Sequence, residues 1–358
     1  MDQQLNSKHV LVAMSGGVDS SMAAALLLEQ GYQVTGMMLH LWCENEDENK
    51  CCTPATVQQA RGVAAKLGFP FYVNDASEPF KKIVVGHFYD AYLHGKTPNP
   101  CYVCNAHFRW QYLLKIADSI GADYLATGHY ARIRHSEDGA YHLLRGLDDW
   151  KDQSYMLSGL SQAQLSRTIL PLGTLKKTDM RQKARQIDLS VADKEDSQDL
   201  CFLGNQDYRD FLKQHVPEAI HPGDIVTRNG QIVGIHEGLA FYTIGQRKGL
   251  GLSSPVPMYV LEKQVDTNQL VVGLEEELGN SELTAGQFNW ISGQPIPERR
   301  KLMVKIRYRA DFHPAWVEAV GTESATIRFE ESMRDITPGQ IAVVYDDEEV
   351  LGSGIIRL

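Results

Sequence analysis

Strand and helix signals alternate over the first 130 residues, and this alternation limits the possible fold more than any other feature of the chain. The apolar run 9–14 predicts a buried strand, and the next run predicts a helix that Ser20 or Ser21 caps and Gly31 ends. Further strands are expected at 33–41, 71–73 and 124–127, with helices at about 56–67, 79–94 and 105–120. This order is typical of a parallel sheet covered by helices on both faces, with ligands at the carboxyl ends of its strands.

The pattern changes after about residue 205. Asn229-Gly230 between two β-prone runs is a strong hairpin signal, and short β-prone runs separated by turn residues fill the rest of the chain. The runs lie at 258–262, 269–273, 302–309, 315–320, 325–329, 341–345 and 350–356. We therefore predict an α/β domain at 1–205, a small β-rich domain at 206–280 and a barrel-like β domain at 281–358.

The distribution of charge is more informative than its total. A net charge of −10 argues against a polyanionic partner, because such binding is driven by basic residues. However, eleven acidic residues lie in three clusters at 44–48, 275–277 and 346–349, and without them the balance would be +1. The stretch 299–309 has six basic residues and no acidic one, and 151–190 has seven against three. We expect these basic stretches to face a polyanion and the acidic clusters to face away.

No apolar run approaches the ~20 residues of a membrane span, and the first residues contain no apolar signal region. We expect a cytoplasmic protein without a membrane partner.

Residues 15–21, with the sequence SGGVDSS, lie between the first strand and the first helix. Two glycines let backbone N–H groups approach an anion, and the helix N-terminus adds partial positive charge. The GxxxxGK[ST] pattern is absent, so the loop differs from that of the common kinases and GTPases. It resembles the pyrophosphate loop of the N-type ATP pyrophosphatases, whose fold is adenine nucleotide alpha-hydrolase-like and which release pyrophosphate while adenylating an oxygen.

This resemblance implies ATP with Mg²⁺ as cofactor, with the metal carried by the nucleotide and Asp19 as a candidate protein ligand. Leu39, at the end of the second strand, and Gly128, after the fourth, would flank the nucleotide. The phosphates would contact Ala13, Met14, Ser15, Gly16, Gly17, Val18, Asp19 and Ser20.

Cys101 and Cys104 follow the turn Thr97-Pro98-Asn99-Pro100 and open a helix, where the helix dipole favours a thiolate. Cys201 lies near the end of the α/β region. These cysteines could be half of a zinc site, three corners of an iron–sulfur cluster, or a thiol–persulfide pair for sulfur transfer. A second cysteine pair for zinc is missing and His107 would be a poor ligand, but the residues alone do not choose further. Cys43, Cys51 and Cys52 receive no role.

Several motifs then occur together in one order. They are SGGVDSS, GKTPNP with Cys104-Asn105, ATGHYAR (126–132), KDQSY (151–155), DSQDLCF (196–202), HEGLAFYTIGQRKGLG (236–251), RYR (307–309) and TPGQ (337–340). This set resembles the tRNA-specific 2-thiouridylase family over essentially the whole chain. That family uses ATP to replace the 2-oxygen of the wobble uridine with sulfur.

The resemblance implies that Cys104 is the catalytic nucleophile and that Cys201 carries the persulfide and forms a transient disulfide with it. Asn99, Pro100 and Cys101 would contact the target base. Contacts with tRNA would come from His129, Lys151, Asp152, Gln153, Arg307, Tyr308 and Gln340. Some members have aspartate, a candidate acid or base, where this chain has Cys101, which leaves that role open and keeps the cluster alternative.

The residues suit this chemistry, because adenylation turns a poor leaving group into AMP and a persulfide then supplies sulfur. Cys104 would either free hydrosulfide or accept the sulfur transiently, and both routes end in a Cys104–Cys201 disulfide. Lys305, Arg307 and Arg309 alternate along an expected strand, which would place three cations on one face. Expected partners are tRNAs of the Lys, Glu and Gln acceptors and a sulfur-donor protein, a cysteine desulfurase or relay protein. The alternatives are a thiolase with a three-cysteine iron–sulfur cluster and an amidating ATP pyrophosphatase.

Overall fold

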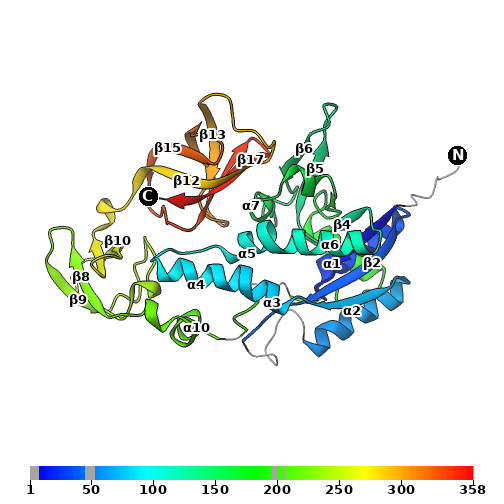
Figure 1. Cartoon of the computed structure of the whole chain (residues 1–358), viewed down its shortest axis with the longest axis horizontal. Helices are drawn as coiled ribbons and strands as arrows, with labels where there is room; N and C mark the ends of the chain where they lie inside the picture. The colour runs from blue at the N-terminus through cyan, green and yellow to red at the C-terminus, as the bar shows by residue number, and fades with distance from the viewer. Residues whose placement is uncertain (1–7, 45–52, 196–199, 205, 358) are drawn as a thin grey trace.

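The fold was analysed in a computed structural model that describes residues 8–44, 53–195, 200–204 and 206–357. The acidic residues at 46–48, Cys51, Cys52 and residues 196–199 lie outside the described residues. Within the described ranges, no helix combines the length and the apolar character that crossing a membrane requires. Figure 1 shows the α/β domain beside a β-barrel, with a small β domain at one end.

The α/β domain is built on a five-stranded parallel sheet of order β3-β2-β1-β4-β7. Its central strand is fully buried at Val10, Leu11 and Val12, as expected for a parallel sheet covered on both faces. The strands are β1 (His9–Ala13), β2 (Gln33–His40), β3 (Phe71–Asp75), β4 (Tyr124–Ala126) and β7 (Thr168–Ile169). The predicted parallel α/β fold is confirmed.

Helix α1 (Val18–Glu29) begins one turn earlier than the serine-cap prediction required. Gly17 is its N-cap and provides no side-chain cap, so the prediction that Ser20 or Ser21 caps the helix is wrong. Both serines lie inside the first turns, and their hydroxyls donate to Gly17 O at 3.3 and 2.9 Å. Helix α2 (Pro54–Leu67) does have a side-chain cap, Thr53, and ends at Gly68 with φ +79°.

Two longer helical segments each contain a π-helical stretch. One runs through α3 (Ser77–Phe80), the π-helix Lys81–Val85 and α4 (Gly86–Leu93). The other runs through α5 (Pro100–Val103), the π-helix Cys104–Arg109 and α6 (Trp110–Ser119). The two π-helical stretches pack against each other, and such stretches are frequent at functional sites.

The remaining elements of the first domain are shorter. They are β5 (Ala131–His135), β6 (Tyr141–Arg145), α7 (Ser154–Leu157), α8 (Gln162–Leu165) and α9 (Lys177–Gln186). The small domain contains a four-stranded sheet of order β10-β11-β8-β9, preceded by α10 (Tyr208–His215). Its strands are β8 (Gly223–Thr227), β9 (Ile232–His236), β10 (Tyr259–Gln264) and β11 (Gln269–Gly273). Short 3-10 turns lie at Pro217–Ala219, Leu239–Phe241 and Glu275–Glu277.

The C-terminal domain is a closed barrel, because its six-strand order β12-β15-β14-β13-β16-β17 is completed by a β12–β17 pairing. The strands are β12 (Asn280–Trp290), β13 (Arg300–Lys305), β14 (His313–Ala319), β15 (Ser324–Met333), β16 (Ile341–Asp346) and β17 (Glu349–Arg357). Closure pairs the edges that an open sheet would leave exposed. The predicted barrel-like last domain is confirmed.

The expectation of three cations on one strand face is wrong. Strand β13 ends at Lys305, and Arg307 and Arg309 lie in the turn that follows. The chain leaves the sheet there because Arg307 is bound elsewhere: its guanidinium donates to Thr337 Oγ1 at 2.7 Å and pairs with Asp335 at 3.2 Å.

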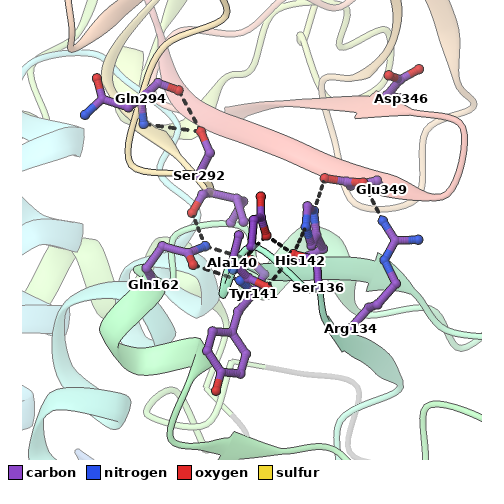
Figure 2. A network of polar contacts seen from close by, with 12 residues as sticks. Arg134, Ser136, Ala140, Tyr141, His142, Gln162, Ser292, Gln294, Asp346 and Glu349 are labelled. Atoms are coloured by element: carbon purple, nitrogen blue, oxygen red, sulfur yellow. Dashed lines mark hydrogen bonds and ion pairs between the residues drawn. The ribbon is translucent and has the colours of Figure 1, made fainter.

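The β5–β6 hairpin of the first domain joins the barrel through β17 (Figure 2). Glu349 accepts from Arg134 at 3.0 Å and contacts His142 Nδ1 at 2.6 Å, and Glu348 accepts from Arg132 at 2.6 Å. Gln162 Nε2 also donates across the junction to Ile291 O at 2.6 Å. The acidic residues 348–349 thus bind the two domains together instead of forming a solvated face.

Candidate active site

The phosphate loop is ordered by its own hydroxyls. Ser20 Oγ accepts from Ser15 N at 3.1 Å, and Gly16 has φ +67°. A Cβ on Gly16 would lie 2.4 Å from Thr56 Cγ2 and 2.8 Å from Thr56 O, so only glycine fits this turn. The N–H groups of a helix's first turn have no partner within the helix, and here no side chain caps them. This arrangement is suited to an anion.

Gly128 meets the same loop from the end of β4. A Cβ there would lie 2.7 Å from Asp19 C and Ser20 N, so the predicted nucleotide-flanking glycine and the predicted phosphate loop come together. Ala13 and Met14 continue β1 into the loop, and Met14 N donates to Met37 O at 2.8 Å. Val18 is buried at the helix start, and Leu39 is a partly buried side chain near the end of β2.

Asp19 is held by two residues that sequence reasoning missed. Lys177 Nζ lies 2.7 Å from both carboxylate oxygens, and the Tyr130 hydroxyl donates to Oδ1 at 2.9 Å. Lys177 is buried, with 7% of its surface exposed, whereas the Asp19 side chain is 32% exposed, so water reaches the pair from the carboxylate side. Lys177 is the first residue of α9, which follows β7 in the chain. If β7 had been predicted from the sequence, Lys177 would have been expected at the carboxyl edge of the sheet.

A second missed lysine supports the loop from the opposite side. Lys194 Nζ donates to Gly16 O at 3.0 Å and to Gln59 Oε1 at 2.7 Å. Burial lowers the pKa of Lys194. Two cations thus lie against a loop whose backbone is suited to phosphate.

Asp19 does not fit a Mg²⁺ site as arranged, because its two oxygens already bind Lys177. Among the described residues, no group of three or more His, Cys, Asp or Glu side chains could hold a metal ion. In this structure Cys101, Cys104 and Cys201 are therefore not gathered as three ligands of one metal ion.

Cys104 and Cys201 belong to one apolar cluster although 97 residues separate them. Cys104 is buried at the start of a π-helix, Cys201 is partly buried, and Cys101 is exposed. Phe80 bridges the two regions, because its ring lies 5.5 Å from that of Phe108 and 6.2 Å from that of Phe202. Cys43 is buried nearby, and its thiol donates to Phe202 O at 3.6 Å.

The turn before the cysteine helix is held by the barrel. Thr97 N donates to Pro338 O at 2.9 Å, and Gln340 Nε2 donates to Thr97 O and Pro98 O at 3.0 and 3.2 Å. Asn99 is buried and caps α5 by accepting from Tyr102 N at 3.1 Å. Pro100 occupies the first position of this helix and is buried. Gln340, a predicted tRNA contact, therefore also fixes the predicted base-binding turn.

Three tyrosines line the junction between this helix and the barrel. Tyr102 OH lies 3.0 Å from Ser353 Oγ, and Tyr155 OH donates to Ile341 O at 2.8 Å. The Tyr308 ring lies 6.0 Å from the Tyr155 ring, and burial and then Asp152 raise the pKa of Tyr308.

The three residues 151–153, which are predicted to contact tRNA, differ in their surroundings. Asp152 is buried and accepts from Gly146 N at 2.9 Å and Ser154 N at 3.1 Å. Gln153 Oε1 accepts from Tyr130 N at 3.0 Å. Of the three, Lys151 carries the charge suited to a phosphate.

His129 and Arg307 are also engaged within the protein. His129 Nδ1 lies 2.8 Å from Thr127 Oγ1, and burial and then Arg109 lower the pKa of His129 to about 3. Arg307 donates to Ile244 O at 3.4 Å in addition to its contacts with Asp335 and Thr337. It thereby links the small domain to the barrel.

The chain was then compared with known proteins. It matches the family described as tRNA methyl transferase HUP domain over 8–205, the tRNA methyl transferase PRC-barrel domain over 209–274, and the aminomethyltransferase beta-barrel domain over 280–356. A tRNA-specific 2-thiouridylase MnmA of Carboxydothermus hydrogenoformans is 46% identical, with 99% of this chain and 98% of that protein covered. The chain belongs to the tRNA-specific 2-thiouridylase family. A MnmA of Clostridioides difficile is 44% identical, with 98% of each chain covered.

Membership in the 2-thiouridylase family confirms the predicted enzyme class: an ATP-dependent sulfurtransferase that acts on the wobble uridine of tRNA. The amidating alternative is thereby set aside. Among solved structures, NMN synthetase from Francisella tularensis is 19% identical with a TM-score of 0.38, covering 57% of this chain and 72% of that one. The predicted domain boundaries and the roles of individual residues remain predictions.

Proposed function

We propose that this 2-thiouridylase adenylates the 2-oxygen of the wobble uridine at the phosphate loop and then transfers sulfur through Cys104 and Cys201. Ala13 to Ser20 bind the phosphates of ATP, and Leu39 and Gly128 flank the nucleotide. Lys177 and Lys194 supply positive charge where pyrophosphate leaves, a form of preorganised electrostatic stabilisation. Mg²⁺ enters with ATP.

The observation that carries the proposal is that Cys104 and Cys201 contribute to one apolar cluster beside the turn 97–100. Asn99 and Pro100 at the end of that turn, with Cys101 in the helix that follows, receive the extruded base, which must leave its stack to be reached. Asn99 caps the cysteine helix, so the base-binding turn and the nucleophile form one rigid unit.

The sulfur atom can reach the base by one of two routes. A sulfur-donor protein leaves a persulfide on Cys201, and the Cys104 thiolate attacks its inner sulfur, forming the Cys104–Cys201 disulfide and releasing hydrosulfide. Hydrosulfide then displaces AMP from the adenylated base. In the second route, the Cys104 thiolate takes the outer sulfur and frees the Cys201 thiolate. The Cys104 persulfide then displaces AMP from the base, and Cys201 attacks the Cys104 sulfur, which forms the disulfide and leaves the sulfur on the base. Both routes require a thiol reductant to reopen the disulfide before the next turnover.

An iron–sulfur cluster on Cys101, Cys104 and Cys201 does not fit this arrangement, because one thiol is buried, one is exposed and the described residues form no metal-holding group. We therefore derive no step through a cluster.

Contact with tRNA extends from this site onto the barrel. Lys151 and Tyr308 carry the direct contacts, while Gln340, Arg307, Asp152, Gln153 and His129 hold the surfaces that tRNA meets. The preferred substrates are the Lys, Glu and Gln acceptors.

Cysteine substitution tests the proposal. Cys104→Ser and Cys201→Ser should each abolish sulfur incorporation from the donor protein, measured by mass spectrometry of the anticodon nucleoside, while tRNA-dependent pyrophosphate release persists. Cys43→Ser is the matched control, because it changes a buried thiol that contacts the residue next to Cys201 and keeps a donor for Phe202 O. Retained incorporation in either test variant would contradict the proposal. Added sulfide distinguishes the two routes. It should restore thiolation in Cys201→Ser if hydrosulfide is the species that displaces AMP, and it should not do so on the second route.

A further inference from the structure

Trp150 is the most exposed large apolar side chain among the described residues, with 94% of its surface in contact with solvent. It lies between β6 and α7, where Leu147 is 52% exposed. Single exposed apolar side chains are common, so exposure alone does not indicate a function. The turn that carries Trp150 is also held in place by hydrogen bonds.

This turn is fixed by hydrogen bonds on both sides of Trp150. Asp148 Oδ1 accepts from Trp150 N at 3.1 Å, and Asp148 O accepts from Lys151 N at 3.0 Å. Asp148 Oδ2 accepts from Lys177 N at 2.8 Å, which ties the turn to the residue that holds Asp19. The indole is thus presented by an ordered backbone, so little conformational entropy is lost when a partner covers it.

The chemistry of the turn favours RNA over protein as this partner. Aromatic rings bind unpaired nucleobases by stacking, and a neighbouring cation such as Lys151 binds the phosphate. The exposed apolar surface consists of Trp150 and Leu147, which is far less than a stable protein interface requires. One ring face nevertheless suffices for one base.

We propose that Trp150 stacks on a nucleobase of the substrate tRNA and acts as a positioning residue for thiolation. The proposal deepens the proposed function, because it rests on the contact between Lys151 and tRNA.

Tryptophan fluorescence provides a direct test with unmodified tRNA. Of the five tryptophans, Trp110 and Trp290 are buried, Trp42 is partly buried and Trp316 is 40% exposed, so the quench that Trp150 contributes is the part that Trp150→Phe removes. Trp150→Phe should lose most of the quench and bind tRNA within about threefold of the wild type. Trp150→Ala and Trp150→Leu should each raise Kd and KM for tRNA by about tenfold, as expected for the loss of one base stack, with kcat at saturating tRNA and KM for ATP preserved.

Ile235→Ala is the matched control, because Ile235 is 73% exposed on β9 in the small domain. It should leave quenching and KM for tRNA unchanged. Equal binding by Trp150→Leu and Trp150→Phe would overturn stacking, and unchanged quenching in Trp150→Phe would overturn the contact. A defect confined to sulfur delivery from the donor protein, with normal tRNA binding, would assign Trp150 to a protein partner and overturn the proposal. Binding without ATP or sulfur does not depend on the cysteine mechanism, so the two proposals can fail separately.

Discussion

The phosphate loop (residues 15–21) and the segment 97–104, here called the cysteine loop, are assembled in opposite ways. The phosphate loop is formed by consecutive residues of one strand, one turn and one helix, and its supporting lysines come from the same domain. The cysteine loop depends on the barrel, through Pro338 and Gln340, and on the segment around Cys201. The phosphate loop is therefore supported by lysines of its own domain, whereas the turn before Cys104 is also held by the barrel.

Because the two loops have separate supports, we expect that one substitution near the phosphate loop disables adenylation without disturbing the cysteine loop. Lys177→Met should lower tRNA-dependent pyrophosphate release by about 10²–10³-fold, the usual loss when a preorganised electrostatic group is removed. It also leaves the Asp19 carboxylate, whose side chain is 32% exposed, without its cation, which should lower the stability of the fold.

Lys183→Met on the same helix is the control, because Lys183 is exposed. The control should retain wild-type pyrophosphate release. Pyrophosphate release within threefold of the wild type in Lys177→Met would show that Lys177 only stabilises the fold.

The sequence was informative where the structure is local. SGGVDSS was readable as a strand–turn–helix junction because its seven consecutive residues cover both the turn and the start of the helix, and Gly128 was placed at its edge by the strand before it. Lys177 escaped because β7 has only two residues, too few to show a strand pattern.

Long-range contacts explain the other misses. The position of Arg307 is determined by Thr337 and Asp335, which lie about 30 residues away, so the alternation of charges around it gave the wrong local structure. Strand β12 was missed because its sequence, NSELTAGQFNW, has little apolar character before it pairs with β15 and β17.

A substitution in the barrel should damage the sulfur site while sparing the nucleotide site. Gly339 has φ +92°, and a Cβ there would lie 2.9 Å from Thr97 O and 3.0 Å from Thr97 N. Gly339→Ala should displace the turn 97–100 and reduce sulfur incorporation by about tenfold, about 1.4 kcal/mol in the barrier, with ATP affinity unchanged.

Gly321→Ala is the control for Gly339→Ala, because it separates the effect of the contact with Thr97 from the effect of backbone strain. Gly321 also lies in the barrel domain and has φ +66°, but a Cβ there meets nothing within 4 Å. Both variants should lose about 1 kcal/mol of stability from the left-handed backbone, and only Gly339→Ala should lose thiolation. An equal loss of thiolation in Gly321→Ala would show that the barrel acts through its stability alone.

The smallest expected effect concerns His129, which lies where the two regions meet. It follows Gly128, and its ring lies 5.6 Å from that of Trp110 in the cysteine helix. Burial and then Arg109 lower the pKa of His129 from 6.5 to about 3, so the ring is neutral in the folded protein near neutral pH. Because the folded-state pKa is the lower one, the unfolded chain takes up the proton first. The contribution of neutral His129 to stability is therefore complete above pH 6.5 and is lost as the pH falls from 6.5 towards 3.

His129→Gln should consequently flatten the decline in stability on acidification. Between pH 6.5 and 5.5 the wild type should lose about 1 kcal/mol more than the variant, measured by urea unfolding at each pH. His221→Gln, at an exposed position, should follow the wild-type curve. The same titration sharpens the contrast between the two regions: with His129 neutral throughout, the pH dependence of thiolation near neutrality should belong to the cysteines. An unchanged pH profile of activity in His129→Gln supports that assignment, and the loss of a titration step from the profile of the variant contradicts it.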